Sequence, residues 1–471
     1  MKKIKDIIKQ FGLSIAKGDI WVKLSLIIMG AGYFGRKQIV KGIIMTLFEV
    51  AFIWFTATVG VPNLSKFGTL GTVQFEQKFD IVTMTNVVND YDNSFLILLL
   101  SIISLIFIVM FVVIYMANMI HVYNLQVLKA EGKRINTFKQ DCKSYINEKF
   151  HITLLTLPIA GVVIFTVVPL IIMIAVAFTN YDQNHMPPSA LFTWVGFKNF
   201  IDLFTTTTTV TFGYSFRVVL GWTFVWAVFA TFTTYFGGIM LAKFLNNPKT
   251  KCSKLWRSLF VVTIAVPQFV SLLVVRNFFA NTGIVNALCS EWGITELLKN
   301  IGLVKDSLTY IPFLSDPNWA KVMIIIINIW VGVPYQMLVA TGVLMNIPNE
   351  LMESARIDGA TEFQAFMKIT MPYMLFITGP ALVTDFIKNI NNFNVIYLLT
   401  QDVYTTANQA LANSSAKEVD LLVTWLFRLT SEQYNYKMAS VIGCVVFVIC
   451  SVFTLIMFNN MIKGDKEGTF Q

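Results

Sequence analysis

Apolar residues run in long stretches along this chain, separated by short segments that hold most of its charged residues. A stretch of about 18 or more apolar residues is long enough to cross a bilayer as an α-helix. Eight such stretches are expected: Gly42–Ser65, Phe95–Ile120, Thr153–Phe178, Val218–Ala242, Ser258–Val275, Val322–Asn349, about 373–393 and Met438–Ile462. The sequence therefore predicts an all-α, polytopic transmembrane helical bundle of about eight spans.

Two of these stretches contain ionisable residues. Glu49 interrupts the first stretch, and Asp385 and Lys388 interrupt the seventh. A charged side chain inside a bilayer is costly and usually marks a functional position or an ion pair. The seventh stretch is therefore either a weak span or a span with a functional role.

Composition and charge exclude several other classes of protein. Apolar residues make up 55% and charged residues 13% of the 471 positions, and the mean hydropathy is +0.65, which excludes a soluble domain and a disordered chain. Of the 36 Lys and Arg residues, 24 fall in segments assigned to the cytoplasm and seven fall outside. This bias predicts two cytoplasmic termini and accounts for the net charge of +9 without a nucleic-acid partner. The apolar run Leu24–Gly35 is too short to span and is expected to lie in the membrane interface.

Motifs for ATP hydrolysis, metal binding and catalysis are missing from the sequence. It contains no GxxxxGK[ST] loop, so any ATPase that drives this protein must be another polypeptide. The three histidines fall in separate loops, which gives no support for a metal site. No nucleophile and base stand together, so an intramembrane enzyme is not favoured.

Segment 349–372 is expected to form two short helices joined by a turn. Asn349 can cap the first helix and Gly359 can end it, while Thr361 and Gln364 form a capping box for the second, which Pro372 is expected to end. Four residues give the second helix one predominantly apolar face: Phe363, Phe366, Met367 and Thr370. This face either rests on the bundle itself or inserts into a groove of a cytoplasmic partner.

The same segment resembles the EAA loop of binding-protein-dependent ABC importer permeases. It reads Glu353-Ser354-Ala355, three residues, Gly359, nine residues, then Ile369-Thr370-Met371-Pro372, with Ser354 and Met371 as conservative departures. In that family the loop docks on the ATPase subunit. The resemblance implies a coupling role for five residues: Glu353, Ala355, Asp358, Gly359 and Pro372.

Three further segments are similar to the maltose/maltodextrin-type permeases, namely 195–204, Asn328–Met337 and Asn389–Thr400. The loop between the third and fourth stretches has about forty residues, which resembles compact Gram-positive relatives rather than the Gram-negative permease with its large domain there. The expected layout is a cytoplasmic or interfacial N-terminal segment (1–41), two spans with a basic cytoplasmic loop (42–152), a six-helix permease core with the EAA loop at 349–372 (153–462) and a cytoplasmic tail (463–471).

Polar residues in the sixth and seventh stretches are candidates for substrate binding. Asp385, Asn389 and Asn392 stand at i, i+4 and i+7 on one helical face, with Lys388 beside them. Either this face lines a cavity that holds a polar ligand, or Asp385 pairs with Lys388 and the asparagines join helices. Asn328, Val331, Gly332 and Tyr335 also follow helical spacing, for close packing or for the same cavity. The resemblance implies substrate contacts at Val331, Gly332, Tyr335, Asn389 and Asn392, whereas Asp385 and Lys388 depart from the family and leave the identity of the sugar open.

The resemblance implies the permease subunit of an ABC importer in a bacterial cytoplasmic membrane, moving an oligosaccharide of the malto-oligosaccharide kind by alternating access. Its implied partners are a second permease subunit, two ATPase subunits that use ATP and Mg²⁺, and an extracytoplasmic sugar-binding lipoprotein, with no cofactor or metal in this chain. The alternative is a self-sufficient secondary transporter that uses Asp385 as its ion-linked carboxylate.

Overall fold

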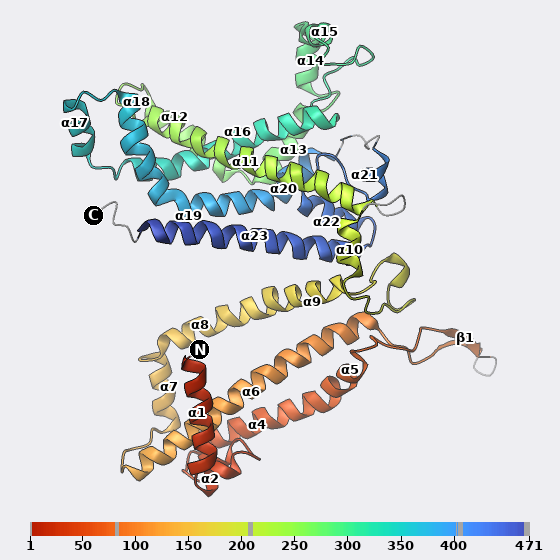
Figure 1. The fold of residues 1–471 in the computed structure, drawn as a ribbon, viewed down its shortest axis with the longest axis vertical. Coiled ribbons are helices and arrows are strands. Elements are labelled where there is room, and N and C mark those ends of the chain that lie inside the picture. The colour runs from red at the N-terminus through yellow and green to blue at the C-terminus, as the bar shows by residue number, and fades with distance from the viewer. Residues whose placement is uncertain (1, 81–83, 206–210, 402, 404–407, 466–471) are drawn as a thin grey trace. The chain divides into compact units, whose positions relative to one another are not determined.

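The computed structural model describes residues 2–80, 84–205, 211–401, 403 and 408–465 (Figure 1). The chain folds as two compact units, Met1–Gly196 and Phe197–Gln471. Seven helices are long and apolar enough to cross a membrane, or eight if one sharply bent pair counts as a single span. The predicted all-α bundle of about eight spans is confirmed within these described residues, with one small β-hairpin in addition.

The first unit contains three spans, at 39–66, 94–130 and 150–177. Its helices are α1 (Lys2–Lys17), α2 (Ile20–Leu24), α3 (Ala31–Phe34), α4 (Ile39–Phe55), α5 (Val61–Lys66), α6 (Ser94–Ala130), α7 (Phe138–Ile146), α8 (Phe150–Val162) and α9 (Val168–Ala177), with strands β1 (Gln77–Asp80) and β2 (Thr85–Val88). Glu49 does not face the lipid unpaired, because its carboxylate accepts the backbone N–H of Met29 at 2.8 Å. The structure thus gives this acidic residue of the first span a local structural role.

Three of the long helices contain a π-helical turn that ends two residues before a proline. These turns are Thr56–Gly60 before Pro62, Val163–Val167 before Pro169, and Phe366–Thr370 before Pro372. A proline inside a helix removes a backbone donor and crowds the carbonyl one turn earlier, and a wider turn relieves that crowding. The helix therefore continues through each of these prolines. The prediction that Pro372 ends the second loop helix is wrong for this reason.

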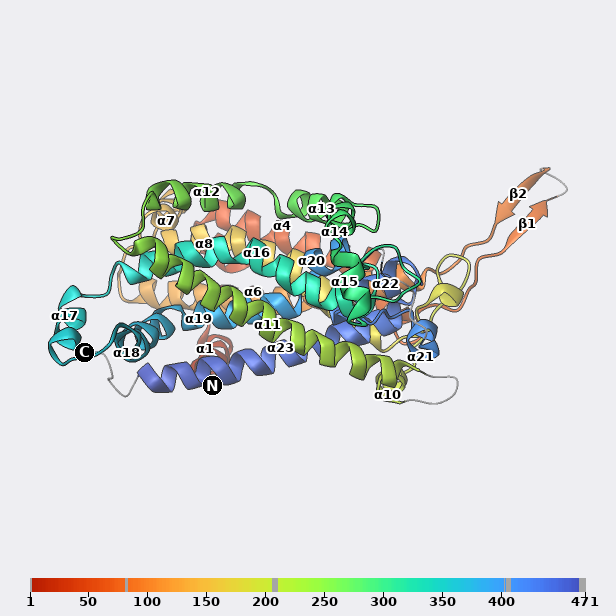
Figure 2. The ribbon, with the colours of Figure 1, turned by 90° about the horizontal axis from the view of Figure 1, so that it is seen from above.

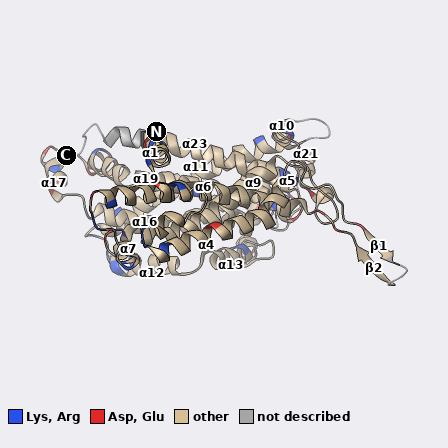
Figure 3. Cartoon of the chain, turned by 90° about the horizontal axis from the view of Figure 1, so that it is seen from below, with Lys and Arg blue, Asp and Glu red and all other residues tan. Residues whose placement is uncertain are grey.

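The second unit contains the remaining spans. Its helices are α10 (Lys198–Phe204), α11 (Phe212–Asn246), α12 (Ser253–Ala265), α13 (Gln268–Phe278), α14 (Ile284–Glu291), α15 (Ile294–Asn300), α16 (Pro317–Leu344), α17 (Asn349–Ile357), α18 (Glu362–Ala365), α19 (Met371–Ile390), α20 (Phe393–Leu399), α21 (Gln409–Asn413), α22 (Leu422–Ser431) and α23 (Tyr436–Asp465). Figure 3 shows that charged residues are sparse along the long helices.

Helices α11 and α16 form the most extensive helix pair of the second unit (Figures 1 and 2). Glycines allow their close approach, since a Cβ on Gly238 would lie 2.4 Å from the Cβ of Gln336, and a Cβ on Gly332 would lie 2.7 Å from Thr234 Cγ2. Trp226 of α11 and Ile324 of α16 are buried in the same hydrophobic core cluster. Both helices of this pair also contribute polar residues to the cavity described next.

The fifth span differs from its prediction. A continuous helix was expected over Ser258–Val275, but α12 and α13 are separate helices that meet at an angle of 97°. Val266 and Pro267 form the break in extended backbone, because proline disfavours the helical conformation of the residue before it. The bend turns the segment around 262–268 toward α16.

Candidate functional site

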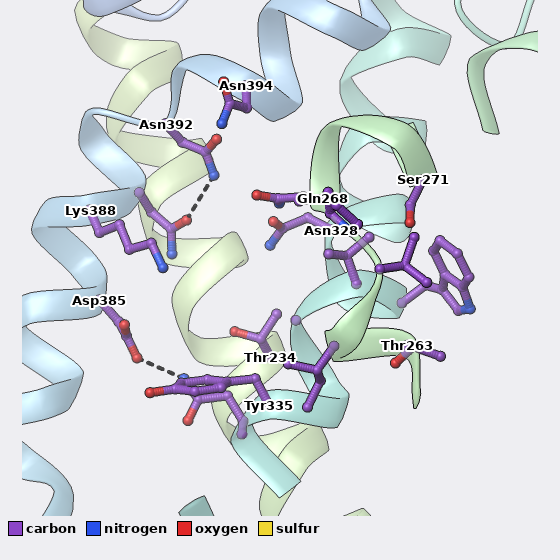
Figure 4. A pocket seen from close by; sticks show the side chains of 18 of the residues that line it. Thr234, Thr263, Gln268, Ser271, Asn328, Tyr335, Asp385, Lys388, Asn392 and Asn394 are labelled. Carbon is purple, nitrogen blue, oxygen red and sulfur yellow. Dashed lines mark hydrogen bonds between the residues drawn. The ribbon is translucent and has the colours of Figure 1, made fainter. Parts of the chain in front are cut away.

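A cavity of about 780 Å³ bordered by many polar side chains lies within the second unit, between α11, the break of α12 and α13, α16, and the junction of α19 with α20 (Figure 4). Its polar lining consists of Thr234, Thr263, Gln268, Ser271, Asn328, Tyr335, Gln336, Asp385, Lys388, Asn389, Asn391, Asn392 and Asn394. Trp330, Phe393 and several aliphatic residues complete the wall. A cavity of this size with many carboxamides is suited to a neutral polar ligand that both donates and accepts hydrogen bonds.

All seven residues proposed from the sequence to contact substrate line this one cavity: Val331, Gly332, Tyr335, Asp385, Lys388, Asn389 and Asn392. Four of them are separated from the other three by more than forty positions of the chain, so their meeting is a property of the tertiary fold. Substrate contact by these residues stays a prediction.

The prediction that Asp385, Asn389 and Asn392 lie on one face of a continuous helix is wrong in one respect. Helix α19 ends at Ile390, and Asn392 begins the next helix, where its side chain caps α20 by accepting the N–H of Val395 at 3.3 Å. The helix ends here because the carboxamide of an asparagine competes with the backbone for helical hydrogen bonds and favours caps. Asn392 therefore has a structural task besides any contact with ligand.

The two central asparagines also bond to each other and to α11. Asn392 Nδ2 donates to Asn389 Oδ1 at 3.3 Å (Figure 4). Asn389 Nδ2 donates to Thr231 Oγ1 at 2.9 Å. The indole of Trp226 donates to the backbone carbonyl of Asn389 at 3.0 Å. The asparagines thus join helices and line the cavity at once, and both roles foreseen for them are compatible.

The alternative prediction, an ion pair between Asp385 and Lys388, is wrong. Asp385 accepts a hydrogen bond of 2.7 Å from Gln336 Nε2, which links α19 to α16. Lys388 is exposed on the cavity side and forms no hydrogen bond or ion pair with any residue that the structure describes. The cavity therefore presents one ammonium group and one carboxylate that already has a partner.

Gly332 and Tyr335 differ in their roles. Gly332 packs against Thr234 of α11, as close helix packing requires, while it also borders the cavity. Tyr335 is exposed, and no hydrogen bond to its hydroxyl is found within the described part of the chain. Its ring is therefore free to contact a ligand or a neighbouring subunit.

The sequence prediction missed one wall of the cavity. Thr263, Gln268 and Ser271 reach it from both sides of the break between α12 and α13. Pro267 in the middle of an apolar stretch was the available signal for that break. Because this stretch was predicted to be an ordinary span, these three residues were not proposed to line the cavity.

The loop after α16 forms the two predicted helices. Helix α17 stops at Ile357, and Gly359 has φ +75°, a backbone conformation that glycine adopts without strain. The capping box of Thr361 and Gln364 is present in both directions. One detail is wrong, because Pro348 rather than Asn349 occupies the N-cap of α17.

The residues proposed for coupling are spread over this loop. Glu353, Asp358 and Gly359 are exposed, Ala355 is buried, and Pro372 lies inside the long helix that continues into α19. Large apolar side chains project beside them, with Ile357 87% and Phe363 71% exposed. An exposed apolar surface of this kind is typical of a docking site for another protein.

The described residues hold no cluster of three or more His, Cys, Asp or Glu residues that could bind a metal ion. A bundle of membrane spans with a cavity rich in polar side chains and an exposed two-helix loop is typical of a membrane transport subunit.

Comparison with known proteins agrees with this class. Residues 234–463 match the family model described as binding-protein-dependent transport system inner membrane component. The maltodextrin transport system permease protein MdxF of Bacillus subtilis is 32% identical over 94% of this chain and 95% of its own length. The galactooligosaccharides transport system permease protein GanP of the same organism is 31% identical over 94% of this chain and 97% of its own length. The chain belongs to this family of ABC importer permeases.

Two other comparisons concern the fold and the extent of the match. The maltose/maltodextrin permease MalF of Salmonella typhimurium is 30% identical, but over only 56% of this chain and 48% of its own length. The crystal structure of a bacterial ABC transporter involved in the import of the polysaccharide alginate contains a chain with a TM-score of 0.50 and 21% identity. This match covers 69% of the present chain and 99% of the other, and it supports the fold.

Proposed function

We propose that this protein is the permease subunit through which an ABC importer moves an oligosaccharide, of the malto-oligosaccharide kind, by alternating access. The observation that carries the proposal is that α16 and α19–α20 bring all seven candidate residues to the same cavity. The names of MdxF and GanP support an oligosaccharide, since one is a maltodextrin and the other a galactooligosaccharide permease.

The lining of the cavity fits the chemistry of a sugar. Each sugar hydroxyl both donates and accepts, and a carboxamide offers two donors and an acceptor. Gln268, Asn328 and Asn394 add three carboxamides to those of Asn389 and Asn392. The rings of Trp330 and Tyr335 supply apolar surface for the C–H faces of a pyranose.

Coupling to ATP is assigned to α17 and α18. These helices lie at the end of the second unit where α23 also ends (Figure 1), which supports a cytoplasmic C-terminus together with the bias of the basic residues. Ile357 and Phe363 supply the apolar contact, and Glu353 meets a cationic site of the ATPase. ATP and Mg²⁺ bind to two such ATPase subunits, and this chain needs no cofactor and hydrolyses nothing itself.

The remaining partners are a second permease subunit that completes the transport path and an extracytoplasmic sugar-binding lipoprotein that delivers the ligand. A bacterial cytoplasmic membrane, with both termini inside, is the proposed location. A Gram-positive source is supported by the match to MdxF over nearly the whole of both chains, compared with half of MalF.

Uptake by the reconstituted complex tests the proposal. Proteoliposomes containing this chain, its partner permease and the ATPase subunits should take up maltotriose only with ATP at the ATPase side and with the sugar-binding protein present. A protonophore should have no effect. Uptake by this chain alone that requires no ATP and collapses with the protonophore would instead show the secondary transporter.

A further inference from the structure

The amphipathic helix α1 is bound to the protein along one part of its surface only. In its sequence Ile7, Ile8, Phe11 and Ile15 share one face, while the lysines at positions 5 and 9 fall on the opposite face. Phe11 packs against the core cluster of the first unit that contains Met119 and Val122. Ile7, Ile8 and Ile15 of this face remain exposed, Ile8 by 57%.

The position of α1 is fixed by contacts at its C-terminal end. Gln126 of α6 accepts the backbone N–H of Asp19 at 2.9 Å and donates to the carbonyl of Lys17 at 3.2 Å. Asp19 in turn caps α2 and pairs with Arg36 at 3.2 Å. These hydrogen bonds attach α1 to the rest of the first unit. The exposed isoleucines of α1 therefore have a fixed position on the surface of that unit.

The orientation of α1 distinguishes it from the spans. Within the first unit α4, α6, α8 and α9 run alongside one another, and α1 crosses α6 (Figure 1). In the view turned by 90° α1 is seen almost end-on while the spans are seen lengthwise (Figure 2). A helix that crosses membrane spans in this way lies parallel to the plane of the bilayer.

The charge of this region is strongly basic. Lys5, Lys9 and Lys17 are exposed on α1, and none of them forms an ion pair with a residue in the described ranges. Lys23 follows on α2, beside the exposed Ile20 and Trp21. An apolar face, a lysine-rich face and an adjacent tryptophan are the features that bind a helix to the surface of an anionic bilayer.

From these four observations we propose that α1, extended by Ile20 and Trp21 of α2, binds anionic phospholipid headgroups at the surface of the membrane. The isoleucines enter the boundary between headgroups and acyl chains, and Lys5, Lys9 and Lys17 pair with lipid phosphates. The α1 helix thereby anchors the segment that precedes the first span. This assignment is independent of the sugar that the cavity binds.

Depth measurements on the full-length protein test the proposal. Single cysteines for a fluorescent label are placed at Ile8→Cys, on the apolar face, and at Gln10→Cys, on the exposed polar side, in a cysteine-free chain reconstituted into vesicles with brominated lipids. Quenching should be strong at position 8 and weak at position 10. Equal weak quenching at both positions would overturn the membrane assignment. Burial of the label at position 8 that is seen only when the ATPase subunits are present would also overturn it, because the apolar face would then bind those subunits.

The role of charge is tested by comparing phosphatidylcholine vesicles with vesicles containing equal amounts of phosphatidylcholine and phosphatidylglycerol. Quenching at position 8 should rise several-fold with phosphatidylglycerol, and the triple variant Lys5→Gln/Lys9→Gln/Lys17→Gln should abolish that rise. The control Lys249→Gln/Lys251→Gln/Lys254→Gln removes the same charge from the loop before α12 and the first turn of that helix, and the rise should persist in this control. A rise that survives in the α1 variant, or no rise in the parent, would overturn the anionic-lipid preference.

Discussion

Gln336 donates a hydrogen bond of 2.7 Å to Asp385 and so links α16 to α19 beside the cavity. A carboxylate with this partner can be structural, or it can carry the coupling ion of a secondary transporter. Asp385→Asn keeps an acceptor for Gln336 but cannot carry a proton or bind a cation as a charge. Because transport is proposed to be driven by ATP, we expect this variant to retain uptake within about a factor of five, a loss of roughly 1 kcal/mol at most.

The contrasting variant for this contact is Asp385→Leu. It leaves the amide of Gln336 without a partner, and it should reduce both assembly and uptake. ATP-driven uptake in proteoliposomes, with the yield of assembled complex measured in parallel, checks both. Complete loss of uptake in a well-assembled Asp385→Asn complex would favour the ion-coupled alternative.

Asn392 allows its role as a helix cap to be separated from contact with the sugar. Asn392→Ser retains an oxygen that can cap α20 but removes the amide donor. We expect normal assembly and an affinity for maltodextrin reduced about tenfold, because a lost ligand hydrogen bond costs roughly 1–1.5 kcal/mol. Uptake measured as a function of sugar concentration gives the change, and Asn346→Ser, outside the cavity, is the matched control. Unchanged uptake by Asn392→Ser would show that Asn392 caps α20 and does not contribute to sugar binding.

Charge reversal on α17 tests the coupling loop. Glu353→Lys should leave the chain inserted and folded, because the side chain is exposed, yet it should oppose a cationic site of the ATPase. Ligand-stimulated ATP hydrolysis is expected to fall at least tenfold. Glu291→Lys at the end of α14 makes the same change of charge elsewhere and should have little effect. Full stimulated hydrolysis in the Glu353 variant would contradict the docking role.

The close contact of α11 with α16 predicts opposite effects for two glycines of α11. Gly238→Ala places a Cβ 2.4 Å from Gln336 Cβ and 2.7 Å from its backbone carbon, so the helices must separate, at about 1–3 kcal/mol of stability. Gly221 has nothing within 4 Å, and Gly221→Ala should be neutral or stabilising by up to about 1 kcal/mol. The midpoints of thermal unfolding in detergent compare the two. Equal midpoints would contradict the packing argument.

The β-hairpin of the first unit should loosen at low pH through Asp92. Burial opposes ionisation of this carboxyl group, but the Lys66 ammonium at 2.6 Å and the backbone N–H groups of Thr72 and Val73 outweigh it and hold the pKa of Asp92 below its usual range. Since the folded-state pKa is lowered, the stabilisation is present above the unfolded value of about 4 and is lost as the pH falls through the folded value.

Hydrogen exchange of the hairpin amides measures this effect. Protection around residues 73–80 should decrease as the pH falls through the folded-state pKa of Asp92, after correction for the intrinsic exchange rate. Asp92→Asn should lower the protection roughly tenfold at neutral pH, the loss of about 1.5 kcal/mol for charge-assisted bonds, and remove its dependence on pH. The exposed neighbour variant Asp90→Asn should behave like the parent. A pH-independent parent would contradict the assignment.

The sequence by itself determined the features that depend on neighbouring residues. Long apolar stretches mark the spans, because a helix is the form in which a chain satisfies its backbone in lipid without outside partners. The turn at Gly359 and the capping box of Thr361 and Gln364 were predictable for a related reason, since caps involve residues only three or four positions apart. Helical spacing likewise placed Gly332 and Tyr335 on one side of α16.

Only the tertiary structure decided which distant groups meet. The partners of Asn389 and Asp385 are Thr231 and Gln336, which lie 158 and 49 positions away, and no local pattern contains such distances. The 97° bend after α12 places Gln268 at a cavity whose other walls come from α11, α16, α19 and α20, so the position of Gln268 depends on distant parts of the chain. Whether a polar side chain in a span faces lipid, a neighbouring helix or a cavity is set by the packing of helices, and that packing is non-local.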